Sequence, residues 1–209
     1  MIYRDRRDAG RRLAEHLQDY DNTNAIVCAL PRGGVPVAAE VASILHLELR
    51  LLFVRKLGVP WQPEVAFGAI GEDDICVINS RLVADLGLSS ERIAAVRSAA
   101  QAQLTRAQAI FGTTAASTST LPDTVILVDD GIATGATVEA AIAVLRARDV
   151  GHIVVAAPVA AADTVRRLRL RADEVVVPLV PQDFQAVGQY YRDFRQLSDD
   201  EVRAILGGG

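Results

Sequence analysis

The chain has few of the residues that would indicate a disulfide framework, a metal centre or a membrane anchor. Its two cysteines, Cys28 and Cys76, lie far apart in apolar runs and lack the spacing of a metal or redox pair. No apolar run approaches the ~20 residues needed to span a bilayer. Residues 1–12 are rich in arginine and aspartate and do not resemble a signal peptide. We therefore expect a cytoplasmic protein with no membrane partner.

The chain also lacks an excess of basic residues. It carries 22 lysines and arginines against 26 acidic residues, a net charge of -4, so no general attraction draws it toward nucleic acid. The arginine cluster in residues 166–171 is typical of a solvated helix face. We expect no nucleic-acid partner, and a small-molecule ligand bound at a local site.

Hydrophobic periodicity predicts alternating strands and helices. Short apolar runs between turn residues predict buried strands, and apolar residues at helical spacing predict helices. The expected strands cover residues 25–30, 48–54, 65–70, 75–78, 125–128, 153–157 and 174–177, and expected helices include residues 5–20, 91–111 and 163–171. This order predicts an α/β fold, with a mostly parallel central sheet flanked by helices and ligands at the carboxyl ends of its strands.

This core is expected to cover residues 1–177, with two irregular segments inside it and a further segment after it. Residues 55–66 contain prolines, a glycine and a tryptophan, and are predicted to form a loop too long for a simple connection. Residues 112–120 are predicted to be a polar linker. Residues 178–209 hold several aromatic side chains and are predicted to form a small C-terminal hood.

The most informative segment is residues 125–137, in which an apolar strand runs into two aspartates, a glycine turn and a helix. Unpaired N–H groups and hydroxyls at the start of a helix suit a dianionic phosphate, and Gly135 allows close approach. Asp129 and Asp130 can accept hydrogen bonds from vicinal hydroxyls or hold a hydrated Mg²⁺. A sugar phosphate offers both groups, so the segment predicts a ribose 5-phosphate site. The alternative is an exposed Asp-Asp-Gly turn with Thr134 as a helix N-cap.

The same segment closely resembles the 13-residue phosphoribosyl-pyrophosphate signature of type I phosphoribosyltransferases. Residues 31–34 resemble that family's pyrophosphate loop, which implies a cis Pro31–Arg32 peptide; the alternative is a simple turn before a helix. Residues 55–60 resemble the start of the flexible lid that closes over the active site in adenine-type members; the alternative is a surface hairpin. The resemblance covers roughly residues 24–190 and is greatest to a bacterial group whose substrates are generally unassigned.

The resemblance implies a role for each matched residue. The 5-phosphate would be bound by Ala133, Thr134, Gly135, Ala136 and Thr137, the ribose hydroxyls by Asp129 and Asp130, and the pyrophosphate by Arg32, Gly33, Gly34, Arg55 and Lys56. Mg²⁺, held indirectly by the two aspartates, would neutralise the leaving group, and Arg32 and Lys56 would stabilise the same charge. The implied reaction is displacement of pyrophosphate from 5-phosphoribosyl-1-pyrophosphate by a ring nitrogen of a base. Relatives are commonly dimers, so a homodimer is expected.

One position departs from part of the family. Hypoxanthine/guanine-type members have an acidic residue at the position of Ala133, proposed to take a proton from the acceptor, and alanine cannot do this. Adenine-type members also have a small residue there and are proposed to use an acid of the lid, so Glu64 is our candidate; the alternative is a solvated loop charge. Phe184, and after it Tyr190, are candidates to stack on a planar acceptor, with core packing as the alternative.

Three functions remain open at this stage. The first is phosphoribosyl transfer to a nitrogenous base, with purines among the candidates. The second is a ligand sensor that keeps the site but has lost the chemistry, which Ala133 favours somewhat. The third is a hydrolase that uses the same cradle for another sugar phosphate. The sequence leaves the acceptor and turnover undecided.

Overall fold

The structure, a computed structural model, describes residues 2–111 and 121–207, except for the side chains of residues 63 and 64. The linker predicted at residues 112–120 therefore lies outside the described residues. In chain order the elements are α1 (Arg6–Ala14), η1 (Gln18–Tyr20), β1 (Ile26–Ala29), α2 (Gly34–Ile44), β2 (Glu48–Leu51), β3 (Val54–Val59), β4 (Gln62–Gly71), β5 (Cys76–Ile78), α3 (Ser80–Asp85), α4 (Ser90–Phe111), β6 (Thr124–Val128), α5 (Ala136–Ala147), β7 (His152–Ala156), α6 (Ala162–Leu168), β8 (Glu174–Val176), η2 (Val187–Tyr190) and α7 (Asp199–Leu206). Within this part of the chain, no helix is both long and apolar enough to cross a bilayer.

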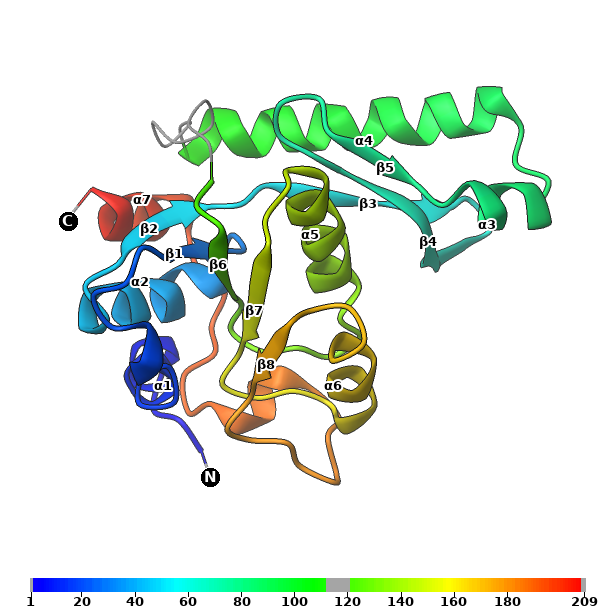
Figure 1. Ribbon diagram of the computed structural model, residues 1–209. Helices are drawn as coiled ribbons and strands as arrows, with labels where there is room; N and C mark the ends of the chain where they lie inside the picture. The colour runs from blue at the N-terminus through cyan, green and yellow to red at the C-terminus, as the bar shows by residue number, and fades with distance from the viewer. Residues whose placement is uncertain (1, 112–120, 208–209) are drawn as a thin grey trace.

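Five parallel strands form the central sheet, in the order β2-β1-β6-β7-β8. Helices α1 and α2 lie on one side of it, and α5 and α6 lie on the other (Figure 1). This arrangement confirms the predicted α/β fold with a parallel sheet flanked by helices. Strands β1 and β6 are neighbours, and their last residues, Ala29 and Val128, pair directly. The segments that follow these two strands therefore start at the same edge of the sheet.

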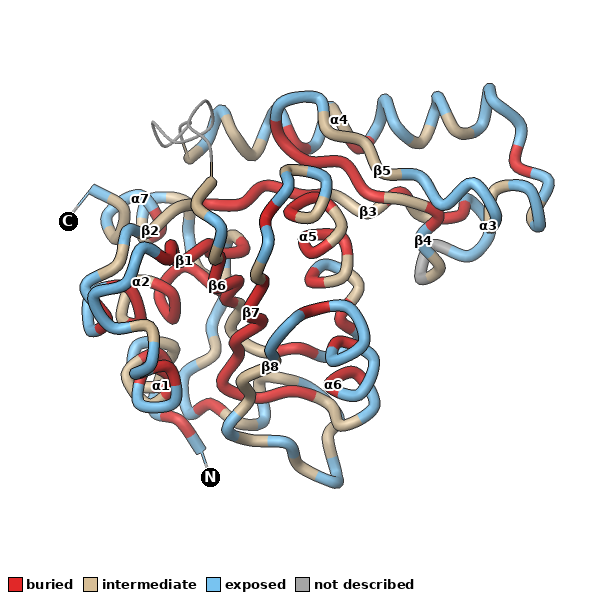
Figure 2. Tube along the Cα trace, in the orientation of Figure 1, coloured by how far each residue is buried: buried red, intermediate tan, exposed pale blue. Residues whose placement is uncertain are grey.

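The inner strands β1, β6 and β7 are almost entirely apolar because both faces of the sheet are covered. Alternate residues such as Val27 and Ile126 pack into one apolar layer, and their neighbours such as Ile26 and Leu127 pack into the other. Figure 2 shows the resulting continuous burial of β1, β6 and β7. Cys28 lies within this core, where burial raises the pKa of its thiol to about 12, as expected for an unreactive cysteine.

The structure corrects the prediction that residues 55–66 form a loop. Strands β3 and β4 pair antiparallel through this region, from Val54 opposite Gly71 to Val59 opposite Gln62, and the turn is confined to residues 60–61. The prolines and glycine suggested a loop, but Leu57 and Val59 are buried in the main core, which stabilises the hairpin. The predicted hairpin of residues 65–70 with 75–78 is confirmed, since β5 pairs with β4.

Helix α4 lies along this small antiparallel sheet, and together they form an arm that extends from the body of the molecule (Figure 1). Most of α4 is exposed, as Figure 2 shows, and its fully buried residues are Ala100 and Leu104. Its C-terminal end packs on the connection between β2 and β3, where Phe111 stacks on Phe53 with ring centroids 6.3 Å apart. This connection lies beside the end of β1, because the Leu52 N–H donates to the Ala29 carbonyl at 3.0 Å. The arm thus reaches the edge of the sheet where the predicted site lies.

The C-terminal tail packs at two places on the body. Aromatic residues of its first half form a small apolar cluster with Tyr3, and the Tyr3 N–H donates to the Tyr190 carbonyl at 2.7 Å. In its second half, α7 packs against α2 and α4, and Val202 is fully buried in the main core. Both halves of the tail therefore pack on the core.

Candidate functional site

The two aspartates that follow β6 form a poorly solvated acidic pair. The side chain of Asp130 is only 13% exposed and accepts a hydrogen bond from Arg6 Nε at 2.7 Å. The carboxylate of Asp129 accepts from the backbone N–H of Asp130 at 2.9 Å. Burial raises the pKa of both carboxyls; the charge of Asp130 raises the pKa of Asp129 further, whereas Arg6 acts to lower both. This pair does not fit the alternative of an exposed turn.

Arg6 reaches the acidic pair from α1, more than 120 residues earlier in the chain. Its guanidinium lies over the ring of Phe194, with Cζ 4.0 Å from the ring centroid, and Nη1 donates to the Arg195 carbonyl at 3.0 Å. The tail also contacts the acidic turn directly, because the Tyr191 hydroxyl donates to the Asp130 carbonyl at 2.5 Å. Sequence reasoning missed Arg6 and Tyr191, since no local pattern links them to Asp130.

The segment after β1 approaches the acidic pair as closely as backbone allows. The Pro31–Arg32 peptide is cis, as the family resemblance implied. A Cβ atom at Gly33 would lie 2.1 Å from Asp130 Oδ2, and one at Gly34 would lie 2.7 Å from the Val128 carbonyl oxygen. Both glycines are therefore required by contact rather than by backbone torsion, and residues 31–34 and 129–130 form one site.

The side chain of Arg32 points away from the acidic pair toward the start of α7. Its Nη1 donates to the Leu197 carbonyl and to Asp199 Oδ1, both at 3.2 Å. Arg32 and Asp199 are 41% and 38% exposed, so this ion pair contributes little to stability and can be exchanged for a ligand. The basic side chain predicted for pyrophosphate is thus available at the edge of the site.

The predicted 5-phosphate loop turns sharply into α5. Gly135 has φ of 75°, in the left-handed region that favours glycine. Ala133, Thr134 and Thr137 are exposed, and the helix begins at Ala136. Among the described residues, the N–H groups of Thr134 to Thr137 have no hydrogen-bond acceptor. These amides and the positive end of the helix dipole suit an anion.

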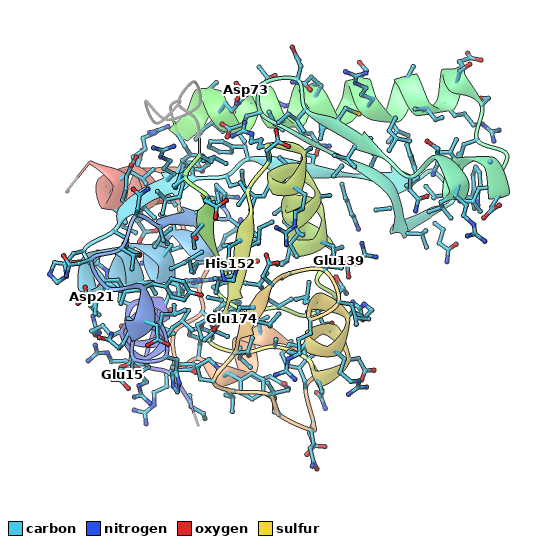
Figure 3. The ribbon with its side chains drawn as sticks, viewed as in Figure 1. Glu15, Asp21, Asp73, Glu139, His152 and Glu174 are labelled. Carbon is cyan, nitrogen blue, oxygen red and sulfur yellow. The ribbon has the colours of Figure 1, made fainter. Side chains whose placement is uncertain are left out.

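Helix α6 supports this loop from one side. Thr164 Oγ1 donates to the Ala133 carbonyl, and Arg167 Nη2 donates to the Thr134 carbonyl, both at 2.6 Å. Figure 3 shows Glu139 between α5 and α6, where it lies 3.4 Å from Arg167 Nε. With its carbonyls held in this way, the loop presents its N–H groups outward. Arg167 belongs to the arginine cluster that the sequence suggested was only a solvated face.

A Thr164→Val substitution is expected to lower the free energy of unfolding by about 1 kcal/mol, because it removes the hydroxyl that bonds Ala133 while keeping the side-chain shape. Thr164 is 2% exposed, so packing at the site is preserved. Chemical denaturation measures the change. The control is Thr105→Val on the exposed face of α4, expected to change stability by less than about 0.5 kcal/mol. Equal losses in the two variants would contradict the supporting role of Thr164.

Of the two basic residues of β3, Arg55 lines the same cavity as Arg32, and burial lowers the pKa of its guanidinium. Lys56 follows Arg55 on the strand, and its role in pyrophosphate binding stays a prediction. The side chain of Glu64 lies outside the described residues, so its proposed proton-transfer role stays a prediction.

The aromatic residues predicted for the acceptor pack on each other. The rings of Phe184 and Tyr190 are stacked, with centroids 5.8 Å apart and an interplanar angle of 14°. A neighbour that sequence reasoning missed, Val187, covers the acidic turn, because a Cβ at Gly131 would lie 2.4 Å from Val187 Cγ1. Acceptor stacking by Phe184 or Tyr190 therefore stays a prediction, while their segment does contact the site.

The two carboxylates of the acidic pair are a donor set that fits a magnesium ion. No group of three or more His, Cys, Asp or Glu side chains suited to hold a metal occurs in residues 2–111 and 121–207. Mg²⁺ is commonly bound by one or two carboxylates together with water and substrate phosphates. Asp129 and Asp130 supply the two carboxylates, and their poor solvation favours a nearby cation.

Comparison with known proteins places the chain in a family. The model described as "Phosphoribosyl transferase domain" matches residues 76–195. A Mycobacterium tuberculosis protein named "Putative phosphoribosyl transferase Rv0571c" is 46% identical over 205 residues, which cover 98% of this chain and 46% of that protein. The chain thus spans just under half the length of this relative.

Two solved structures have a fold similar to that of this chain. TT1426 from Thermus thermophilus has a TM-score of 0.84 and 43% identity, and the match covers 99% of this chain and 98% of that one. AQ2163 from Aquifex aeolicus, at 13% identity and a TM-score of 0.50 over 88% of this chain and 78% of that one, has a similar fold. The match of the family model to residues 76–195 shows that the chain belongs to the phosphoribosyl transferase domain family.

Proposed function

We propose that the protein binds 5-phosphoribosyl-1-pyrophosphate with Mg²⁺ and transfers its phosphoribosyl group to a nitrogenous base, with release of pyrophosphate. The observation that carries this proposal is the contact between the segment after β1 and the acidic turn after β6. Gly33 lies against the Asp130 carboxylate, and the loop of residues 133–137 continues from the same turn. The segments proposed to bind the diphosphate, the ribose hydroxyls and the 5-phosphate are therefore adjacent, which supports the proposal.

In this proposal each part of the donor meets a complementary group. The 5-phosphate would lie at the start of α5 and accept from the outward N–H groups and from the hydroxyls of Thr134 and Thr137. The ribose hydroxyls would donate to Asp129 and Asp130. The pyrophosphate would lie beside Gly33 and Gly34, where the absence of side chains lets its oxygens approach the backbone.

The chemistry needs charge stabilisation more than a nucleophilic side chain. The C1–O bond to pyrophosphate breaks as the ring nitrogen of the base bonds to C1 from the opposite face, with an oxocarbenium-like transition state. Asp129 and Asp130 would stabilise positive charge on the ribose, and Arg32 would stabilise the departing pyrophosphate. Mg²⁺, when bound, would add charge neutralisation of the same leaving group. The tail segment around Val187 would limit the access of water.

The test is a thermal-shift screen of nucleobases and nucleotides, each with and without 5-phosphoribosyl-1-pyrophosphate and Mg²⁺. We expect the donor with Mg²⁺ to raise the unfolding temperature and one class of base to raise it further, because ordered binding makes the two ligands cooperate. Pyrophosphate release that depends on that base would then establish transfer.

Other outcomes point to the two alternatives. Donor binding without turnover across the whole base panel would indicate a sensor, which the alanine at position 133 allows. Phosphate release in the absence of any base would indicate a hydrolase. No stabilisation by the donor, or equal stabilisation in a protein carrying Asp129→Asn and Asp130→Asn, would refute the proposed function.

A further inference from the structure

A buried ion pair joins helix α1 to the acidic turn that follows β6. Arg6 is the first residue of α1, and its Nε donates to Asp130 Oδ2 at 2.7 Å. The two side chains are only 10% and 13% exposed. Of the ion pairs between described side chains, this is the only one in which both partners are largely buried. It connects a proposed ribose ligand, Asp130, with an arginine to which the proposed function gives no role.

The carboxylate of Asp130 is fixed by two segments that come from elsewhere in the chain. Arg6 of α1 holds its Oδ2 atom. The backbone after β1 packs directly on the same carboxylate, since a Cβ at Gly33 would lie 2.1 Å from Oδ2 and 3.0 Å from Oδ1. Among the described residues, no other side chain donates to this carboxylate. Oδ1 is therefore the oxygen that can accept from a hydroxyl of a ligand.

The C-terminal tail in turn fixes Arg6. The Phe194 ring lies against the guanidinium, 4.0 Å from Cζ, and the Arg195 carbonyl accepts from Nη1 at 3.0 Å. A ring on the face of a guanidinium and a carbonyl at its edge restrict the rotation of an otherwise flexible side chain. The donor that Asp130 meets at Oδ2 is thus held in one orientation before any ligand binds.

A purely structural link between α1 and the tail would not need this arrangement. Arg12, on the same helix, lies over the Tyr3 ring at 5.7 Å and pairs with Asp8 at 3.2 Å while remaining 41% exposed. Arg6 instead loses most of its solvation, a cost that is offset only where the geometry of the pair is good. Its charge is placed on the carboxylate that the ligand is proposed to contact. Such supporting bonds keep a ligand-binding side chain close to its productive geometry.

We propose that Arg6 is a positioning residue for ribose recognition, and that its bond to Asp130 Oδ2 directs Oδ1 at one of the two vicinal hydroxyls of the sugar. Arg6 thereby sets the preference for ribose over a deoxyribose, acting through Asp130. A sugar without that hydroxyl would leave a poorly solvated carboxylate oxygen unpaired, which weakens its binding. This inference rests on the proposed function for the place of the ribose. It does not require that transfer takes place.

Binding titrations with three sugar phosphates, in buffer containing a metal chelator, test the proposal. The ligands are ribose 5-phosphate, 2-deoxyribose 5-phosphate and 3-deoxyribose 5-phosphate. The wild type is expected to prefer ribose 5-phosphate about tenfold over each deoxy sugar, the contribution of one hydrogen bond to a charged group. Arg6→Gln should reduce one of these preferences to about twofold, because the carboxylate is no longer held in place.

Three further variants separate positioning from a structural role. Arg6→Lys still offers Asp130 a charged donor and should retain a preference between those of the wild type and Arg6→Gln. Phe194→Leu keeps the charge and loosens Arg6, so it should lower the same preference even if Arg6→Gln proves unstable. The control is Arg12→Gln, which removes a cation from the same helix and aromatic cluster but does not contact Asp130. It should keep both preferences.

A preference is a ratio of two affinities of one protein, so partial loss of folded protein does not change it. The proposal is overturned if Arg6→Gln weakens all three sugars equally, if Arg6→Lys behaves like Arg6→Gln, or if Arg12→Gln loses as much preference. A wild type that prefers ribose, with the same preference in Arg6→Gln and Phe194→Leu, would reject the role of Arg6 and leave the proposed function intact. A wild type that binds neither these sugars nor the donor would refute the proposed function itself.

Discussion

The Asp129→Asn protein is expected to unfold at a higher temperature than the wild type at neutral pH, and to lose the stabilisation that 5-phosphoribosyl-1-pyrophosphate provides. Asparagine keeps the shape of the side chain and removes a charge that is buried beside Asp130. A stabilising substitution of this kind commonly raises the free energy of unfolding by about 0.5–2 kcal/mol. A ligand at about a hundred times its Kd raises the free energy of unfolding of the wild type by about 2.7 kcal/mol. The variant should lack this gain.

The pH dependence of this difference follows from the raised pKa of Asp129. Below the ordinary value of 3.8 the carboxyl is protonated in both the folded and unfolded states, so its burial carries no charge penalty. As the pH rises above 3.8, the unfolded chain loses the proton while the folded chain keeps it, and the free energy of unfolding falls until the folded pKa is passed. The Asn variant lacks this fall, so its advantage should grow with pH and vanish in acid.

Denaturant titrations over a pH series, in buffer with a metal chelator, measure this effect. The control is Asp85→Asn, which changes a carboxylate that is 67% exposed on α3 and should leave the pH profile unaltered. A wild type that matches or exceeds the Asn variant in stability at neutral pH would show that the buried charge carries no penalty. Retained donor stabilisation in the variant would remove Asp129 from the binding site.

Gly33→Ala is expected to weaken donor binding about a hundredfold while leaving the protein folded. The new Cβ would lie 2.1 Å from Asp130 Oδ2, so either the loop or the carboxylate must move. Both are proposed to contact the ligand, and a misplacement of about 1 Å in such a site can cost about a hundredfold. Calorimetry with 5-phosphoribosyl-1-pyrophosphate and Mg²⁺ measures the loss.

A matched control separates this contact from the general cost of replacing glycine. Gly207→Ala places its Cβ 3.4 Å from the Arg203 carbonyl oxygen, an ordinary contact at a helix end remote from the acidic pair, and should bind the donor normally. Circular dichroism establishes that both variants are folded. Wild-type affinity in Gly33→Ala would mean that the approach of the two segments is not needed for binding.

Local patterns in the sequence predicted the parts of the site that are contiguous in the chain. The aspartate pair and the loop of residues 133–137 were identified because strand, acid, glycine and helix start follow one another within a few residues. The cis peptide before Arg32 was implied by family resemblance and is present. The prediction of a loop at residues 55–66 was wrong. The turn-forming residues outweighed a weak strand pattern, and the strand is stabilised by its pairing with β4.

What the sequence by itself determined is the alternation of apolar strands and amphipathic helices, and with it a parallel sheet whose carboxyl edge carries the acidic pair. Hydrophobic periodicity is a local property, so it is readable residue by residue. Only the tertiary structure decided that Arg6 pairs with Asp130, that Tyr191 and Val187 cover the acidic turn, and that Arg106 shares a cavity with Arg32. These contacts join segments that are far apart in the chain. They depend on how the helices and strands pack, so no local sequence pattern predicts them.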